Sequence, residues 1–321
     1  MTENVSEETL STGSTRRRAI RTAVQLAGGA VLVTGVLWTV GFKAIADAVL
    51  GADPVLLGLA VLVVQAQILA SAWRWRFTAG RLGLAIPFGT AAAEYYLSSL
   101  LNMVLPGGVA GDALRALRSR GAAAAGRSRA AISAVVLERA SGQIAFAVLA
   151  VAGILVWAVS LAAPLPRGSV AAVAVVPLAL AGVGVAASAL RRSGPARLRD
   201  AIGRFVSDIR AGFGTGRSLA VQAGLSLAIG ASYVGVFALC AAAVGSTLPL
   251  PVAAAVIPLV LLSMLLPVTV GGWGLREGAA AVLWPTVGLP AADGAAAAAL
   301  YGLVAVVGAL PGVLSLARRR A

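Results

Sequence analysis

Apolar positions along the chain fall into long blocks that are separated by short polar or arginine-rich stretches. Six of these blocks, at about 22–42, 54–72, 129–161, 170–190, 219–244 and 292–314, are long enough to cross a bilayer as helices. Two further segments, 86–114 and 252–283, each contain proline and several glycines, so neither can be one continuous helix. Residues 1–18 are polar and predict a disordered tail. The pattern predicts an all-α polytopic membrane protein.

An internal repeat divides the chain into two halves. Segments 105–115 and 266–276 both follow the pattern L-P-x-x-V-x-G-x-x-L-R without gaps, half a chain apart. We therefore expect a first membrane repeat over 19–163 and a second over 168–317, each made of span, span, interrupted segment and span. Chance similarity between two glycine-rich loops is the alternative, but the matched proline, leucine and arginine are not the residues that this composition favours.

Composition supports a membrane protein and excludes several kinds of chemistry. Hydrophobic residues make up 59 % of the chain and charged residues 12 %, with a mean hydropathy of +0.92, whereas soluble domains are nearer half and a quarter. There is no histidine, and Cys240 is the single cysteine. This excludes histidine bases and clustered cysteine ligands, so we predict no metal and no cofactor.

The placement of the basic residues predicts a topology. Arginines cluster at 16–21, 74–81, 115–129, 191–217 and 318–320, and the positive-inside rule puts all five clusters in the cytoplasm. The net charge of +14 thus reflects topology, and no nucleic-acid partner is expected. The sequence Trp73-Arg74-Trp75-Arg76 is interpreted as an interfacial anchor, with aromatic rings at the headgroups and guanidinium groups in water.

This topology requires segments 86–114 and 252–283 to enter and leave on the same side, as two re-entrant hairpins. With three crossings per half the second half is upside down, so the predicted fold is six full spans plus two hairpins in an inverted-topology repeat. Both termini, and the basic loop 191–217, would face the cytoplasm at the plasma membrane. A hairpin that crosses fully, compensated by one extra span, is the alternative.

The candidate site consists of charged residues at membrane depth, together with the prolines and glycines that interrupt the helices there. Charges there are costly and functional by default, and interrupted helices expose N-termini that favour anions. Arg115 and Arg276 occupy the same repeat position, which suggests equivalent guanidinium groups facing one cavity. The predicted substrate-binding residues are Asn102, Pro106, Gly107, Gly108, Gly111, Asp112, Arg115, Glu138, Arg139, Gly271, Gly272, Gly274, Arg276 and Glu277.

Two plainer interpretations of the same residues stay open. The glycines could serve only close helix packing. The charges could serve only internal ion pairs, for instance Glu138 with Arg115 or Glu277 with Arg139. A substrate path whose charges partly compensate one another would satisfy both interpretations.

An ordered set of motifs over about residues 20–316 resembles a known family. The motifs are Leu101-Asn102, Leu105-Pro106, Gly111-Asp112 with Arg115, Glu138-Arg139 with Gly142, Pro267, and Gly271-Gly272-Trp273-Gly274 with Arg276-Glu277. They resemble the lysylphosphatidylglycerol synthase transmembrane region, also called the flippase-like domain family. Two-domain members of this family add a cytoplasmic aminoacyl-transferase domain that makes the lipid named in the family's title. Their membrane part is implicated in moving that lipid across the bilayer. The chain ends at Ala321, soon after its last predicted span, so we expect a stand-alone member without lysyl transfer.

Three functions follow as hypotheses. The first is a flippase-like translocase for an amphipathic lipid with a phosphate-bearing headgroup, of phospholipid or polyprenyl-phosphate type. Arg115 and Arg276 would grip phosphate, Asn102 would position it, and Asp112, Glu138 and Glu277 would balance charge or carry a coupling proton. The second is a membrane transferase with Asp112 or Glu138 as base, which the lack of any nucleotide-binding motif or aspartate cluster disfavours. The third is an accessory partner of a lipid synthase or glycosyltransferase in cell-envelope biosynthesis.

Overall fold

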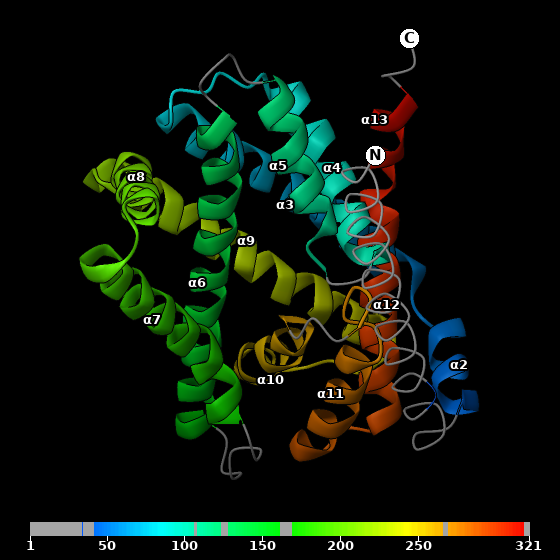
Figure 1. The fold of residues 1–321 in the computed structure, drawn as a ribbon. Coiled ribbons are helices and arrows are strands. Elements are labelled where there is room, and N and C mark those ends of the chain that lie inside the picture. Colours follow the sequence, from blue (N-terminus) through cyan, green and yellow to red (C-terminus); the bar gives the residue numbers. More distant parts are fainter. Residues whose placement is uncertain are drawn as a thin grey trace, which may run out of the picture.

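The computed structural model describes residues 34, 42–105, 108–122, 128–160, 169–265 and 269–317, and the regular elements of this part are helices (Figure 1). The α-helices are α2 (Phe42–Leu50), α3 (Pro54–Arg81), α4 (Phe88–Val104), α5 (Ala110–Ala122), α6 (Ser128–Ser160), α7 (Ser169–Ser193), α8 (Ala196–Phe213), α9 (Gly216–Ala243), α10 (Leu250–Leu262), α11 (Leu275–Leu283), α12 (Ala291–Ala309) and α13 (Leu314–Ala317). The 3₁₀ turns are η2 (Ser263–Leu265), η3 (Trp284–Val287) and η4 (Leu310–Val313).

Four helical stretches within the described residues are long and apolar enough to cross a membrane: 54–81, 128–159, 216–243 and 291–313. They coincide with four of the predicted spans, which confirms an all-helical, multi-pass membrane protein. The predicted span 170–190 lies in α7, and its crossing of the bilayer stays a prediction. The predicted span 22–42 and the tail 1–18 lie outside the described residues, so the total of six spans also stays a prediction.

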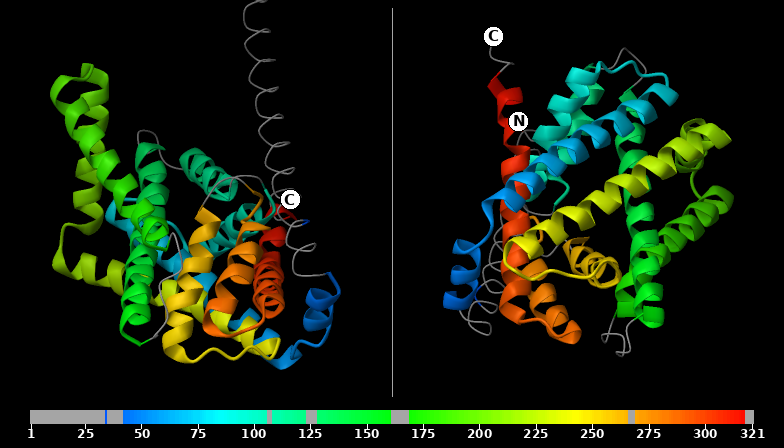
Figure 2. Two further views of the ribbon diagram at one scale, coloured as in Figure 1. Left: turned by 90° about the horizontal axis from the view of Figure 1, so that it is seen from below. Right: turned by 180° about the vertical axis from the view of Figure 1, so that it is seen from behind.

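The two interrupted segments each fold as a pair of short helices. The pair α4 and α5 and the pair α10 and α11 lie towards opposite ends of the molecule (Figures 1 and 2). Helix α6 packs against α5 and α10, and α12 packs against α11 and α4. Helices α3 and α9 run side by side in opposite directions between them (Figure 2). The contacts are reciprocal, because each pair packs on the long helix of its own half and on that of the other.

Small residues allow the long helices to pack closely around a continuous core. Ala60 of α3, Ala241 of α9 and Ala297 of α12 are fully buried in one cluster with large aromatic side chains. Rings of Phe237 and Trp284 lie 5.7 Å apart, centroid to centroid. The second pair of short helices supplies much of this core, since α10 is buried on nearly all sides, as expected for a helix that is apolar all round.

The interpretation of residues 73–76 as an interfacial anchor is only half right. Trp73 and Arg76 are exposed, but Arg74 and Trp75 are buried inside the protein. The reason is helical periodicity, because successive residues in a helix point about 100° apart, so a Trp-Arg-Trp-Arg run divides between two faces. Arg74 is therefore not one of the solvated cytoplasmic charges that the topology counted, and neither is the buried Arg115.

The tips of the two helix pairs touch at the centre of the molecule. Gly271, in the loop before α11, has φ +55°, and a Cβ atom added there would lie 2.3 Å from the carbonyl oxygen of Met103, near the end of α4. Only glycine therefore satisfies both the left-handed backbone and the close approach of the two halves.

Replacement of Gly271 by alanine is expected to destabilise the fold by more than about 2 kcal/mol, because it adds a backbone clash to the conformational strain. Gly245 is the matched control, since it has φ +81° but nothing within 4 Å of an added Cβ. Thermal unfolding in detergent should show a clearly larger loss for Gly271→Ala than for Gly245→Ala. Equal losses would mean that the contact between the tips contributes nothing.

Candidate functional site

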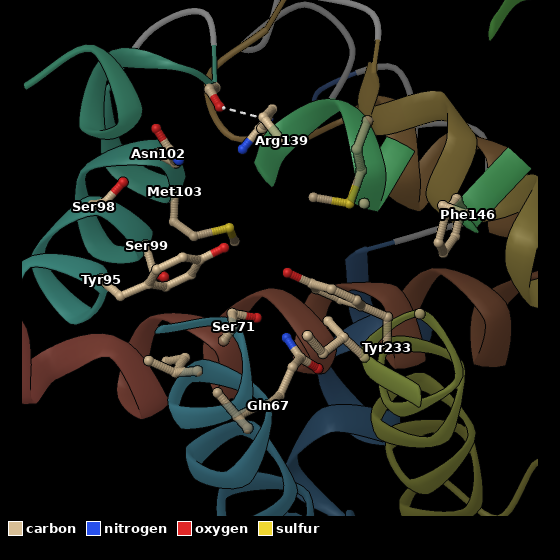
Figure 3. A pocket seen from close by; sticks show the side chains of 18 of the residues that line it. Gln67, Ser71, Tyr95, Ser98, Ser99, Asn102, Met103, Arg139, Phe146 and Tyr233 are labelled. Atoms are coloured by element: carbon tan, nitrogen blue, oxygen red, sulfur yellow. Dashed lines mark hydrogen bonds between the residues drawn. The ribbon is translucent and has the colours of Figure 1, made fainter. Parts of the chain in front are cut away.

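A cavity of about 250 Å³ lies in the middle of the molecule and is lined by residues from both halves (Figure 3). Its wall comes from α3, α4, α5, α6, α9, α10 and α12, together with the loop that carries Gly271. Apolar and aromatic side chains, among them Met103, Phe146 and Met264, alternate with polar ones around this space. The lining is therefore amphipathic, as in sites that bind partly apolar ligands.

Helical periodicity explains which side chains reach the cavity. On α3 the lining residues Gln67, Ser71 and Arg74 follow one face at spacings of four and three. Residues 139, 142, 143 and 146 do the same on α6, as do residues 226, 229, 230 and 233 on α9. Each helix thus turns one stripe of mixed polar, small and larger apolar residues toward the cavity, while its other faces pack on neighbouring helices or face outward.

Glu138 of α6 is the centre of an ionic network in the cavity wall. Its carboxylate accepts hydrogen bonds from Arg74 (Nη2 to Oε1, 2.5 Å), from Arg115 (Nη2 to Oε2, 2.9 Å) and from the Tyr95 hydroxyl (3.0 Å). Arg74 also donates to the Ser226 hydroxyl at 2.9 Å. The network joins α3, α4, α5, α6 and α9, and the fully buried Glu138 is neutralised by two guanidinium groups.

Asp112, in the first turn of α5, forms a second set of contacts. It accepts from Arg115 at 2.9 Å, from Arg139 at 2.6 Å, from Ser98 at 3.1 Å and from the Asn102 amide at 3.0 Å. The Asn102 side-chain oxygen accepts the Gly111 N–H at 2.8 Å, which clamps α4 onto the start of α5. An acidic group at this position is also favoured by the helix dipole.

The charges of the two sets do not cancel. Three arginines, at 74, 115 and 139, face two carboxylates, at 112 and 138, so the cluster carries one net positive charge. The side chains of Arg74 and Arg115 are 5 % and 1 % exposed, whereas that of Arg139 is 41 % exposed. Arg74 and Arg139 both line the cavity, and Arg139 (Figure 3) is the cationic group of this cluster that is most accessible to a ligand.

Arg115 and Arg276 are held in the same way in the two halves. The guanidinium carbon of Arg115 lies 4.7 Å from the ring centroid of Trp75 and 4.4 Å from that of Tyr95. That of Arg276 lies 5.0 Å from the Trp273 ring and 5.2 Å from the Tyr301 ring. Each guanidinium group is thereby enclosed between a tryptophan and a tyrosine and pairs with a carboxylate.

This enclosure corrects the expectation that the two arginines face one cavity. Neither lines it, because aromatic rings cover both guanidinium groups and leave the side chains fully buried. The predicted pair of Glu138 with Arg115 is present at 2.9 Å. The predicted pair of Glu277 with Arg139 is wrong, since Glu277 pairs with Arg276 at 2.6 Å and Arg139 pairs with Asp112.

The predicted site residues divide into three groups. The first lines the cavity: Asn102, Gly108, Asp112, Glu138, Arg139 and Gly271. The second does not line it: Gly111, Arg115, Gly272, Gly274, Arg276 and Glu277. Pro106 and Gly107, like Pro267, lie outside the described residues. The N–H groups expected to meet an anion are partly occupied, since Gly274 N–H donates to the Glu277 carboxylate at 2.6 Å.

Sequence reasoning missed several residues of the cavity wall, chiefly Gln67, Arg74, Tyr95, Gln143 and Tyr233. A signal for Arg74 was present, since Gln67, Ser71, Arg74 and Thr78 form one polar stripe along an otherwise apolar span. Tyr233 shares one face of its apolar block with Gln222 and Ser226, at spacings of four and seven, so the same kind of signal was present there.

The fold and the cavity define a class: an all-helical, multi-pass membrane protein that encloses a partly charged cavity between two halves. The chain belongs to the family of the lysylphosphatidylglycerol synthase TM region, whose family model matches residues 23–312. The match covers nearly the whole chain and includes each helix that lines the cavity, which confirms the resemblance seen in the motifs. A comparison with curated proteins gave no match.

Proposed function

We propose that this protein is a flippase-like translocase that binds an amphipathic lipid with a phosphate-bearing headgroup and moves it across the plasma membrane. The observation that carries the proposal is the central cavity, in which an accessible guanidinium group, Arg139, lies beside apolar and aromatic wall. A net charge of +1 in the ionic cluster suits a ligand with one negative charge, such as a phosphodiester. The apolar wall suits the glycerol and upper acyl chain, or an isoprenoid.

The arginine that meets phosphate in this proposal is Arg139, with Arg74 behind it. Arginine grips phosphate through two parallel N–H donors. The Nη1 group of Arg139 donates a hydrogen bond to Asp112 at 2.6 Å, and its Nη2 group donates one to the Gly108 carbonyl oxygen at 3.3 Å. The second of these is a weak bond that a phosphate oxygen could replace without leaving Asp112 unpaired. Arg115 and Arg276 do not contact the ligand in this proposal. Each stabilises the scaffold of its own half through its buried ion pairs.

Alternating access is the mechanism that the architecture supports. The reciprocal packing of the two short-helix pairs on α6 and α12 is what two-fold related repeats would produce. The cavity lies where the tips of both pairs meet, near Gly271. In an inverted repeat, rocking of one half against the other would open such a central site first to one leaflet and then to the other.

The contacts of the carboxylates favour binding over catalysis. A general base needs a carboxylate that can accept a substrate proton. Asp112 and Glu138 each accept from two arginines and at least one further donor. Both are thus engaged in the scaffold, which favours a translocase over a transferase that uses either of them as base.

The test is transport by the purified protein in vesicles. A phospholipid that carries a fluorescent label on its headgroup, together with a membrane-impermeant quencher, reports movement between leaflets. The proposal expects faster movement than in protein-free vesicles, and no acceleration of a glycolipid that has the same label but no phosphate. Equal rates for both lipids, or no acceleration of either, would contradict it.

The proposed orientation places both termini and loop 191–217 in the cytoplasm. It is testable by cysteine labelling in a Cys240→Ala background. Ser193 and Thr247 are both exposed, and the first precedes the span α9 in the chain while the second follows it. A cysteine at 193 should react with an impermeant maleimide only after the membrane is permeabilised, and one at 247 in intact cells. The reverse pattern would invert the topology.

A further inference from the structure

A second cavity, separate from the central one, lies at the end of α3 and the loop that follows it. It has a volume of about 560 Å³, and its wall includes Trp73, Arg76, Phe77 and Arg81. It shares no lining residue with the central cavity. Its polar part is basic, and its remaining wall is apolar and aromatic.

The two arginines of this cavity are oriented in the same way. The Nε–H of Arg76 donates to the Ile86 carbonyl oxygen at 3.0 Å, and the Nε–H of Arg81 donates to the Ala211 carbonyl oxygen at 3.1 Å. Among the described residues, no hydrogen bond or ion pair involves the Nη groups of either side chain. Each guanidinium group is therefore held through its Nε–H, and its two Nη groups remain as hydrogen-bond donors for a bound ligand.

An aromatic ledge forms the apolar part of the cavity. The rings of Trp73 and Phe77 are stacked, with centroids 5.5 Å apart and an angle of 14° between their planes. Trp73 is 40 % exposed. An exposed tryptophan beside arginines at the end of a membrane-spanning helix is typical of the level of the lipid headgroups.

The neighbouring helix α8 fits the same location. In Figure 1 it is seen nearly end-on, whereas α6 and α12 run along the length of the picture, so α8 lies across the direction of these two helices. It carries exposed arginines such as Arg197, Arg199 and Arg204, a charge pattern that anionic membrane surfaces attract. The bond from Arg81 to Ala211 ties the end of α8 directly to the cavity.

We propose that this cavity binds an anionic phospholipid of the leaflet at the basic end of the molecule, as a resident lipid and not as the transported one. Its phosphodiester is held between the Nη groups of Arg76 and Arg81, and its upper acyl chain lies on the ledge of Trp73 and Phe77. Because Arg81 also binds the end of α8, the lipid stabilises the docking of α8 on α3.

The experiment measures quenching of tryptophan fluorescence in the full-length protein in detergent, with phospholipids that carry bromine on their acyl chains. The part of the quenching that depends on Trp73 is the difference from the Trp73→Phe variant. Brominated phosphatidylglycerol should quench at a concentration at least about tenfold lower than brominated phosphatidylcholine. Both lipids offer the same phosphodiester, but the quaternary ammonium group of phosphatidylcholine offsets its charge and is repelled by the two arginines. Trp73→Phe should remove this preferential quenching, which assigns it to the proposed site. Inorganic phosphate alone should not compete, since it lacks the apolar part.

Arg76→Gln together with Arg81→Gln is expected to abolish the preference for phosphatidylglycerol. The matched control removes two exposed arginines elsewhere at this end, Arg191→Gln with Arg192→Gln, and should keep it. Arg139→Gln should also keep it, which separates this lipid from a ligand of the central cavity. The proposal is overturned if the unmodified protein shows no preference for phosphatidylglycerol over phosphatidylcholine, or if the control pair loses that preference to the same extent. Both outcomes can be read whether or not the Arg76 and Arg81 variant folds.

Discussion

Replacement of Arg139 by glutamine is expected to lower lipid transport by about ten- to a hundredfold, while the protein stays folded. The variant loses the accessible charge of the central cavity. A hydrogen bond to a charged group contributes about 1.5–3 kcal/mol, and each 1.4 kcal/mol is about a tenfold change in affinity. Asp112 keeps its bonds from Arg115, Ser98 and Asn102, so the fold should tolerate the change.

Arg129 gives a matched control on the same helix. Its side chain is 44 % exposed, similar to that of Arg139, and it pairs with a single aspartate, Asp208, at 2.7 Å. Arg129→Gln should leave transport unchanged in the vesicle assay. Arg139→Lys is expected to fall between the wild type and Arg139→Gln, because lysine keeps the charge but loses the planar pair of donors. Unchanged transport by Arg139→Gln would remove this residue from the binding site.

Replacement of Glu138 by glutamine is expected to cost about 3–5 kcal/mol of stability, because it leaves the two buried guanidinium groups of Arg74 and Arg115 without their shared carboxylate. Thermal unfolding in detergent, together with the yield of monodisperse protein, measures this loss. Asp208→Asn is the matched control, since it breaks an ion pair with a half-exposed arginine and should cost less than about 1 kcal/mol.

A double variant tests whether the loss comes from the network itself. Arg115→Gln with Glu138→Gln removes one charge of each sign, so its loss should be clearly smaller than the sum of the two single losses. Additive losses would show that Arg115 and Glu138 act independently, and a loss of under 1 kcal/mol for Glu138→Gln would contradict the central role of this carboxylate.

The sequence by itself determined the class of protein and the positions of its main helices. A block of about 20 apolar residues has one stable form in a bilayer, the helix, because every backbone group must be satisfied within the segment. Four predicted spans therefore agree with helices of the structure to within a few residues at most ends, except that α3 continues well beyond residue 72. The breaks between α4 and α5 and between α10 and α11 also follow from local chemistry, since glycine and proline end helices wherever they cluster.

The sequence also identified the residues that converge, but not what each of them faces. Asn102, Asp112, Glu138 and Arg139 lie together around one cavity, as their cost at membrane depth suggested. Arg115 and Arg276 follow the same repeat pattern and are nevertheless covered, each by a tryptophan and a tyrosine. For Arg115 these rings come from α3 and α4 and for Arg276 one comes from α12, so no local pattern reveals the cover.

Only the tertiary structure decided the roles of the charges. Whether an arginine is solvated, paired or open to a ligand depends on the rotation of its helix and on the neighbours that reach it. Arg74 and Arg76 show this most directly. They are two positions apart on one helix, yet Arg74 lies beside Glu138 in the interior and Arg76 lies at the outer surface. Apolar periodicity fixes that rotation only weakly in a membrane helix, since lipid and protein interior are both apolar.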